Sequence, residues 1–159
     1  MTLLLGVTAV APARLKLPAP LPTRPLRDLD GKVLDFKALR GRVVLVDFWA
    51  TWCGPCREEV PVLKALQSRY GSRGFSVVGL SLDENARPVD QFRKAQALNY
   101  PVAMADLTCT AAFGAVLGLP TLFLADRQGT LVILEQGSIK PKELRRQIER
   151  LWGPAAKVQ

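Results

Sequence analysis

The feature that most constrains the fold is an apolar run, VVLVDFW at residues 43–49, that is followed almost at once by two cysteines. Cys53 and Cys56 lie three positions apart, with Gly54 and Pro55 between them. A continuous run rich in β-branched and aromatic residues is typical of a buried strand, and the residues after Cys56 have helical period. The sequence therefore predicts that the cysteine pair lies at a turn from a strand into a helix.

This position gives the two cysteines different chemical properties. Cys53 is expected where the helix begins, and the unpaired N–H groups and dipole of a first turn can lower a cysteine pKa from about 8.5 toward 7 or below. Cys56 is expected one turn further along on the same face, close enough to form a disulfide with Cys53. Gly54 allows a partner backbone to approach closely, and Pro55 takes an early helical position where its missing N–H costs nothing. The pair is therefore a candidate thiol-disulfide reaction centre.

Composition limits what can surround this pair. A chain of 159 residues with 48% hydrophobic content can bury a core without disulfide staples, so we expect one compact domain. The third cysteine, Cys109, makes the number of cysteines odd, which argues against a disulfide-rich scaffold. We expect Cys109 to be a buried small apolar side chain. The chain has no histidine, which excludes a Cys-His nucleophile pair and any zinc or copper site with a histidine ligand.

The charge balance is basic, with 22 Lys and Arg against 14 Asp and Glu and a formal net charge of +8. Such a balance favours acidic protein partners or an anionic membrane surface. The basic residues are dispersed, with no run long enough to mark a nucleic-acid-binding arm, so we expect no nucleic-acid partner. The simplest interpretation is a solvated basic face that aids solubility.

The first residues allow two interpretations. Residues 2–10 form a short apolar stretch before Ala11-Pro12-Ala13, which resembles the core and cleavage site of an export signal, although no Lys or Arg precedes it. The alternative is a flexible or strand-adding N-terminus. Residues 12–25 hold five of the twelve prolines and are typical of an extended linker. We therefore predict a signal or anchor remnant or flexible linker over residues 1–25, a folded domain over 26–152 and a flexible tail over 153–159.

Within the domain, strand and helix patterns alternate. A hairpin is predicted from residues 26–28 and 33–36 around the Asp30-Gly31 turn. Further strands are predicted at residues 42–49, 75–82, 100–105, 121–125 and 130–135, and helices at 54–70, 87–98, 107–117 and 142–152. This order predicts an α/β fold with a mixed central sheet covered by helices on both faces.

Several segments together resemble a known family. VDFWATWCGPC at residues 46–56 resembles the active-site segment of thioredoxins, and GLPT at residues 118–121 resembles the loop that thioredoxins place opposite it. DGK at residues 30–32, CREEVP at 56–61 and the helical insertion after residue 83 are similar to the TlpA/ResA-like branch of exported thioredoxin-fold proteins. The resemblance covers roughly residues 26–152. It implies a thioredoxin-like fold with an added N-terminal β-hairpin.

The resemblance also implies a mechanism. Cys53 would be the exposed nucleophile that attacks a disulfide of a partner protein, and Cys56 would resolve the mixed disulfide. Asp47, six residues before Cys53 in an apolar strand, would be the acid-base group for Cys56, because desolvation raises a carboxyl pKa. Thioredoxins place a lysine beside this aspartate, but the aligned position here is Gly79. The sequence therefore leaves Asp47 without a counter-ion.

The resemblance further implies a substrate-binding surface around the cysteines. The Leu119-Pro120 bond would be cis, which would turn the backbone of Leu119 toward an extended substrate segment. Trp52 would border the substrate groove, and Gly54 and Pro55 would contact substrate as well, whereas Phe48 and Trp49 are expected in the core. We interpret Glu58 and Glu59 as surface residues that complement the dipole of the first helical turn.

The resulting function hypothesis is a protein-disulfide oxidoreductase. Gly-Pro between the cysteines favours a reductase over an oxidase, and the implied partners are a disulfide-containing protein and an upstream thiol electron donor. Donors of this kind serve cytochrome c biogenesis, copper-site proteins and methionine sulfoxide reductases. We expect a monomer in the periplasm or otherwise outside the cytoplasm, close to a membrane if its N-terminus is an anchor, with the disulfide in place of a cofactor; a cytoplasmic location is the alternative. The alternative function is a Cu(I)-binding or copper-site assembly module that uses the two thiolates.

Overall fold

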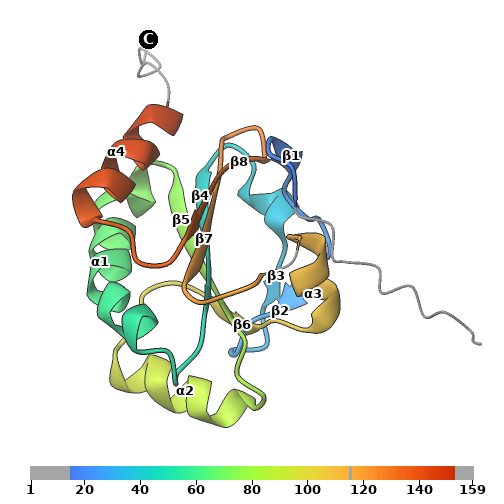
Figure 1. The fold of residues 1–159 in the computed structure, drawn as a ribbon, viewed down its shortest axis with the longest axis vertical. Coiled ribbons are helices and arrows are strands. Elements are labelled where there is room, and N and C mark those ends of the chain that lie inside the picture. The colour runs from blue at the N-terminus through green and yellow to red at the C-terminus, as the bar shows by residue number, and fades with distance from the viewer. Residues whose placement is uncertain (1–14, 115, 153–159) are drawn as a thin grey trace, which may run out of the picture.

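A six-stranded mixed sheet forms the centre of the molecule (Figure 1). The computed structural model describes residues 15–114 and 116–152. The strands in spatial order are β1 (Ala19–Pro20), β8 (Thr130–Gln136), β7 (Thr121–Ala125), β4 (Val43–Trp49), β5 (Phe75–Ser81) and β6 (Val102–Met104). β4, β5 and β6 are parallel to one another. β7 runs antiparallel to β4, β8 runs antiparallel to β7, and β1 runs antiparallel to β8. The predicted mixed sheet is confirmed.

Helices cover both faces of this sheet, as Figure 1 shows. α1 (Gly54–Tyr70), α2 (Ala86–Ala95) and α4 (Pro141–Leu151) share one core with Val43, Leu45 and Trp49 of β4. α3 (Leu107–Ala112) and the 3₁₀ helix η1 (Phe36–Leu39) share the other core with the alternate β4 residues. A second 3₁₀ helix, η2 (Gly71–Arg73), follows α1. All of β4 is buried because each face of its pleat meets a core, which explains why every residue of this strand except Asp47 is apolar.

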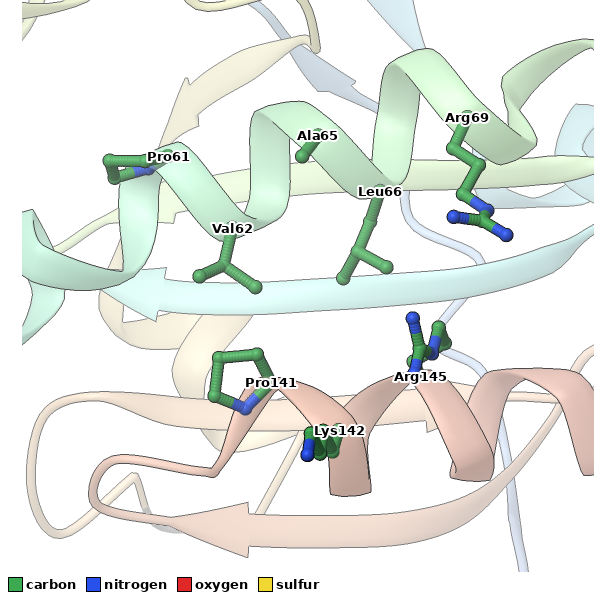
Figure 2. A pocket seen from close by; sticks show the side chains of 8 residues that line it. All are labelled: Pro61, Val62, Ala65, Leu66, Arg69, Pro141, Lys142 and Arg145. Atoms are coloured by element: carbon green, nitrogen blue, oxygen red, sulfur yellow. The ribbon is translucent and has the colours of Figure 1, made fainter.

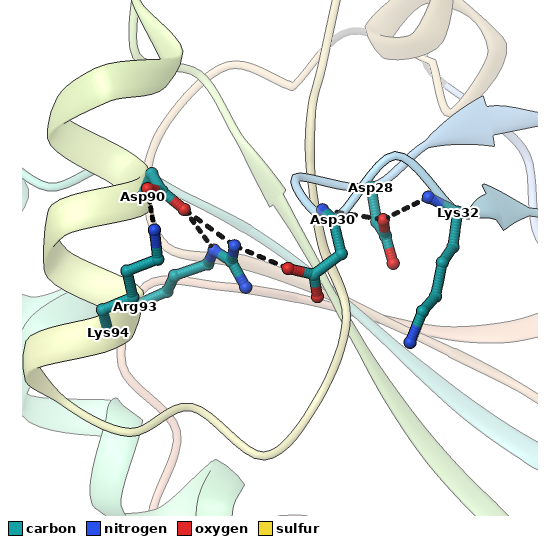
Figure 3. A network of polar contacts seen from close by, with 6 residues as sticks. All are labelled: Asp28, Asp30, Lys32, Asp90, Arg93 and Lys94. Carbon is teal, nitrogen blue, oxygen red and sulfur yellow. Dashed lines mark hydrogen bonds and ion pairs between the residues drawn. The ribbon is translucent and has the colours of Figure 1, made fainter.

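The predicted N-terminal hairpin is also confirmed. β2 (Leu26–Arg27) and β3 (Val33–Leu34) form a separate two-stranded sheet. The hairpin lies beside β6, where Asp28 bridges to Ala103. Figure 3 shows that its turn also contacts α2, because Arg93 pairs with Asp30 at 2.8 Å and with Asp90 at 2.7 Å. Exposed ion pairs stabilise a fold by only about 0–1 kcal/mol, so this network serves mainly to place the hairpin against α2.

The domain begins earlier than the sequence predicts. Ala19 and Pro20, inside the predicted linker, pair with Leu131 and Thr130 at the edge of the sheet. Leu21 is buried, and its N–H donates to the carbonyl of Gly129. The prolines of this segment indicated a linker and not a strand. An edge strand nevertheless tolerates proline, because one side of it needs no hydrogen bonds. The predicted signal or anchor segment up to residue 14 and the predicted tail over residues 153–159 lie outside the described residues.

The helix predicted over residues 107–117 is shorter in the structure. α3 ends at Ala112, and Gly114 follows with a φ of 71°, a left-handed conformation that ends helices. Cys109 is a buried residue of α3, as predicted, and burial raises the pKa of its thiol to about 11. None of the helices in the described ranges is long and apolar enough to cross a membrane.

Candidate active site

The cysteine pair lies where β4 turns into α1, as the sequence predicts. Cys53 is the N-cap of α1, and the N–H of Cys56 donates to its Sγ at 3.3 Å. The two residues are joined by a disulfide, with their Cα atoms 5.3 Å apart. β4 therefore places Cys53 at the N-terminus of α1, where the free N–H groups of the first helical turn stabilise a thiolate.

The disulfide is less exposed than expected for an open nucleophile. Cys53 is 6% exposed and Cys56 is 2% exposed, so the predicted exposure of Cys53 is wrong for the oxidised protein. The reason is that Cys53 forms part of the wall of a groove of about 510 Å³ instead of projecting from the surface. Trp52, which is 69% exposed, projects beside it. Of the two cysteines, Cys53 lines this groove and Cys56 does not.

The groove contains some of the predicted substrate-binding residues but not all. Trp52, Pro55 and Leu119 line it together with Cys53. Sequence reasoning missed a further set of wall residues from the end of β5 and the loop before β7, namely Leu82, Val116 and Leu117. They come from distant parts of the chain, and a lone apolar residue in a loop gives no sequence signal. None of the described residues that line the groove is charged, which suits an apolar segment of a partner.

Gly54 and Pro120 occupy other positions. Gly54 lines a different cleft, with Arg57, Glu58 and Phe92, on the α2 side of the cysteine pair. Pro120 is buried, and the Leu119-Pro120 bond is cis, as the resemblance implies. The carbonyl of Pro120 accepts a hydrogen bond from the N–H of Gly137. Its neighbour Leu119 lines the groove beside Cys53, and Pro120 is not among the described residues that line it.

Asp47 lies in the core on the same face of β4 as Trp49. It is 3% exposed, and its Oδ1 has no hydrogen-bond partner among the described residues. Burial, and then the charge of Glu59, raise the pKa of Asp47 well above its usual value. A carboxyl with a raised pKa holds its proton to higher pH than an ordinary aspartate, which is a property that suits an acid-base group.

Glu59 is a second buried carboxyl, and the sequence interpretation of it as a surface residue is wrong. It is 9% exposed, and its Oε1 accepts a hydrogen bond from the N–H of Ile139 at 3.2 Å. Desolvation raises the pKa of Glu59, and the hydrogen bond from Ile139 partly opposes this. Helical spacing is the sequence signal that indicates this burial. Glu59 follows Cys56 by three positions and lies on the same buried face of α1 as Leu63. Glu58, by contrast, is exposed, as expected.

Gly79 lies opposite Asp47 in the parallel register of β4 and β5, as the alignment with thioredoxins implied. A Cβ at this position would lie 3.1 Å from Trp49 Nε1, 3.3 Å from Val102 Cγ2 and 3.4 Å from Tyr100 Cε2. The space for a lysine beside Asp47 is therefore filled by the side chains of these neighbours. Apolar and aromatic side chains therefore occupy the position where an ion-pair partner of Asp47 would lie. Within the described ranges, Asp47 forms no ion pair.

Replacing Gly79 with alanine is expected to destabilise the fold by about 1–3 kcal/mol, because the buried side chains of Trp49 and Val102 would have to move. The free energy of unfolding, measured in urea, checks this. Gly118→Ala is the matched control, since a Cβ at Gly118 would have nothing within 4 Å. A Gly79→Ala protein as stable as the parent would show that Trp49 and Val102 can move at no cost in free energy.

Replacing Asp47 with asparagine is expected to stabilise the oxidised protein at high pH. Because the folded-state pKa of Asp47 is raised, its contribution to stability is intact below the unfolded value near 4 and is lost as pH rises through the folded value. The variant cannot ionise, so at pH 8 its free energy of unfolding should exceed that of the parent by about 1.4 kcal/mol for each unit by which the folded-state pKa of Asp47 lies above its unfolded-state pKa.

Urea unfolding at pH 4 and pH 8 measures this difference for Asp47→Asn. The gap should close toward pH 4, while the exposed control Glu58→Gln shows no gap at either pH. A gap of the same size at both pH values would contradict a raised pKa of Asp47.

A second groove, of about 420 Å³, lies between α1 and α4, and neither Cys53 nor Cys56 lines it (Figure 2). Val62 and Leu66 of α1 face Pro141 of α4, and Arg69 and Arg145 project toward each other at one end. This basic groove differs from the uncharged groove beside Cys53. Both grooves have apolar residues in their walls, and the groove beside Cys53 differs in that none of the described residues lining it is charged.

The described part of the chain gathers no group of three or more His, Cys, Asp or Glu side chains that could hold a metal ion. Cys109 lies in the core on the other face of the sheet from Cys53 and Cys56. A soft ion such as Cu(I) prefers thiolate or thioether ligands. Cys109 is therefore not placed to add a third thiolate to the two of the copper hypothesis.

Comparisons with known proteins agree with this geometry. The family model described as Redoxin matches residues 16–149. The thiol-disulfide oxidoreductase ResA of a Bacillus cereus strain is 38% identical over 105 residues, which are 66% of this chain and 61% of that protein. ResA of Bacillus thuringiensis subsp. konkukian is 34% identical over 122 residues, which are 77% of this chain and 68% of that protein.

A solved structure extends the agreement to the whole fold. The crystal structure of a thiol:disulfide interchange protein of the thioredoxin family from Chlorobium tepidum TLS has a TM-score of 0.81 at 33% identity. The structural match covers 90% of this chain and 100% of the Chlorobium tepidum chain. The chain spans less than two thirds of the length of the Bacillus cereus relative.

Proposed function

The chain belongs to the Redoxin family, and from this membership and the geometry of its cysteines we propose that it is a protein thiol-disulfide oxidoreductase that reduces disulfides in partner proteins. The observation that carries the proposal is the Cys53-Cys56 disulfide at the N-terminus of α1, with Cys53 in the wall of an apolar groove. A disulfide placed only for stability would have no need of a groove that a second chain can enter.

The proposed reaction has two exchange steps. The Cys53 thiolate attacks one sulfur of the partner disulfide, a mixed disulfide forms, and the other partner sulfur leaves as a thiolate that takes up a proton. Cys56 then loses its proton and attacks Cys53 Sγ, which re-forms the Cys53-Cys56 disulfide and releases the second partner thiol. Two electrons pass from the protein dithiol to the partner disulfide. The cysteine pair itself carries these electrons, so the proposal includes no other cofactor.

Asp47 is the proposed acid-base group for the second step. It is buried on the face of β4 that packs against α1, the helix of Cys56, and its raised pKa suits a group that exchanges protons with Cys56. Glu59 tunes it, because a negative charge on Glu59 makes ionisation of Asp47 less favourable. Two carboxyls therefore take the role that an aspartate and a lysine have in thioredoxins.

The groove beside Cys53 is the proposed binding site for the partner segment. Trp52, Pro55 and Leu119 offer apolar contacts, together with Leu82 and Leu117. Within residues 15–114 and 116–152, neither the N–H nor the C=O of Leu119 has a backbone hydrogen-bond partner. An extended segment could pair with both groups as an added strand does. We expect the residues around the partner cysteine to be apolar.

The setting of the reaction follows from the same resemblance. We place it outside the cytoplasm, in the periplasm or its equivalent, with residues 2–13 as an export signal or membrane anchor. An upstream thiol donor would return the disulfide to the dithiol, and the protein would act as a monomer. Proteins that mature in cytochrome c biogenesis are one class of candidate partner.

An exchange assay tests the proposal. Reduced protein is mixed with an oxidised protein substrate that has one accessible disulfide, and both partners are trapped with acid and counted for free thiols by mass spectrometry. The expected result is one substrate dithiol formed for each Cys53-Cys56 disulfide. A Cys109→Ser variant, which lacks the buried third thiol, should behave like the parent. No transfer of electrons from the parent protein would reject the function.

A further inference from the structure

The short turn that carries Cys53 out of β4 has little support of its own. Only Ala50, Thr51 and Trp52 separate the strand from Cys53, and the N–H of Cys53 donates to the carbonyl of Ala50 at 3.1 Å. Trp52 is 69% exposed, so packing holds it weakly. Besides the disulfide to Cys56, the position of Cys53 in the wall of the groove therefore depends on what fixes the middle of this turn.

Asp83, 32 positions along the chain from Thr51, holds the middle of the turn at two points. Its Oδ2 accepts a hydrogen bond from the N–H of Thr51 at 2.9 Å, and its Oδ1 accepts one from the Thr51 hydroxyl at 2.5 Å. Two bonds from one residue to the two oxygens of one carboxylate fix orientation as well as distance. We name this pair of contacts the Thr51-Asp83 clamp.

The clamp is itself anchored to the sheet. Ser81, the last residue of β5, is fully buried, and its hydroxyl donates to Asp83 Oδ2 at 2.7 Å while it accepts from the N–H of Asp83 at 3.0 Å. The N–H of Leu82 donates to the carbonyl of Trp49 at 2.8 Å, which joins the ends of β5 and β4. Among the described residues, Asp83 forms no ion pair, so hydrogen-bond donors alone satisfy its carboxylate.

The position of the clamp connects it to the groove. Leu82 lies next to Asp83 and Trp52 lies next to Thr51, and both line the groove with Cys53. The clamp thus joins two wall segments that come from different strands. An aspartate that only closed its own loop would not need to bond a residue of the cysteine turn.

We propose that Asp83 is a positioning residue for disulfide exchange, which acts through Thr51 to hold Cys53 in line with a partner disulfide in the groove. The inference rests on the proposed function. Thiol-disulfide exchange needs the attacking sulfur in line with the bond that breaks, and small misplacement of a reacting group is costly in rate. The clamp serves attack by Cys53, and the later attack by Cys56 depends on Asp47 instead.

The test uses single-turnover formation of the mixed disulfide in a Cys56→Ser background, where resolution cannot occur. Asp83→Ala and Thr51→Val should each slow attack on a protein disulfide about tenfold. Thr51→Ser, which keeps the hydroxyl, should restore the rate, and Thr108→Val is the same change at an exposed threonine of α3. The double variant should be no slower than Asp83→Ala alone, because Asp83→Ala already removes the hydroxyl bond that Thr51→Val removes.

Two further readouts separate positioning from other roles. Alkylation of Cys53 by iodoacetamide should change by less than about twofold in all variants, because a small reagent needs no alignment with the groove. Hydrogen exchange at the Thr51 amide should be faster in Asp83→Ala, and this holds whether or not the protein reduces disulfides. Urea unfolding confirms that each variant is folded, and if Asp83→Ala is not, Thr51→Val and Thr51→Ser decide the question.

Three results would overturn the proposal: attack at the parental rate in Thr51→Val, alkylation slowed as much as attack, or multiplied effects in the double variant. Absence of any mixed disulfide in the Cys56→Ser protein itself, with the Thr51 amide still protected by Asp83, would instead reject the proposed function. The two failures are therefore distinguishable.

Discussion

Cys53→Ser is expected to abolish electron transfer to a protein disulfide, whereas Cys56→Ser is expected to accumulate a stable mixed disulfide with the substrate. The difference follows from their positions. Cys53 borders the groove at the N-cap of α1, and Cys56 lies behind it with 2% of its surface exposed. Without Cys53 no nucleophile reaches the partner, so the rate should fall to the level of protein-free buffer. Without Cys56 the attack proceeds and stops halfway.

Mass spectrometry after acid quenching distinguishes the two variants. Cys56→Ser should show one covalent adduct of protein and substrate that dithiothreitol removes, and Cys53→Ser should show none. Cys109→Ser is the matched control, because Cys109 is a buried cysteine on the opposite face of the sheet. An adduct formed equally by both variants would mean that the roles of the two cysteines are not divided as the groove indicates.

Asp47→Asn is expected to slow release of the substrate from the mixed disulfide about 100-fold at neutral pH, because a positioned general base contributes about 10²–10⁴ in rate. Formation of the mixed disulfide should be unaffected, since Cys53 attacks as a thiolate that the N-terminus of α1 stabilises. In the parent, release should accelerate as pH rises through the raised pKa of Asp47.

Glu59→Gln should produce a different change. Removing the charge of Glu59 lowers the pKa of Asp47, so the rise in release rate should move to lower pH without a large loss of maximal rate. Stopped-flow measurement of substrate release from the mixed disulfide across the pH range distinguishes the two variants. Glu58→Gln is the control, because Glu58 is exposed. Release from Asp47→Asn at the parental rate would remove Asp47 from the mechanism.

Local pattern was sufficient to predict the part of the site that lies in one stretch of chain. The strand, the turn and the helix over residues 43–70 follow from an unbroken apolar run and the helical period after it. The burial of Asp47 follows as well, because a residue inside such a strand has a core on either face. The identity of these elements does not depend on contacts with distant residues.

The features that the sequence did not reveal depend on long-range contacts. Glu59 is buried because the loop before α4 covers it and Ile139 donates to it, 80 positions along the chain. Ala19 and Pro20 form a strand only because β8 offers an edge. The Thr51-Asp83 clamp joins two loops whose residues are common in any polar turn. None of these contacts leaves a periodic signal in the sequence.

The reduction potential of the Cys53-Cys56 pair tests the central claim most directly. The Cys109→Ser protein is equilibrated in buffers of stepped glutathione or dithiothreitol potential, alkylated, and scored by mass for dithiol and disulfide forms. A single two-electron transition near about −270 mV, the value typical of thioredoxin, is the predicted result and would make the pair a donor of electrons to partner disulfides. A transition near about −120 mV, typical of the oxidase DsbA, would contradict the proposed direction of the reaction.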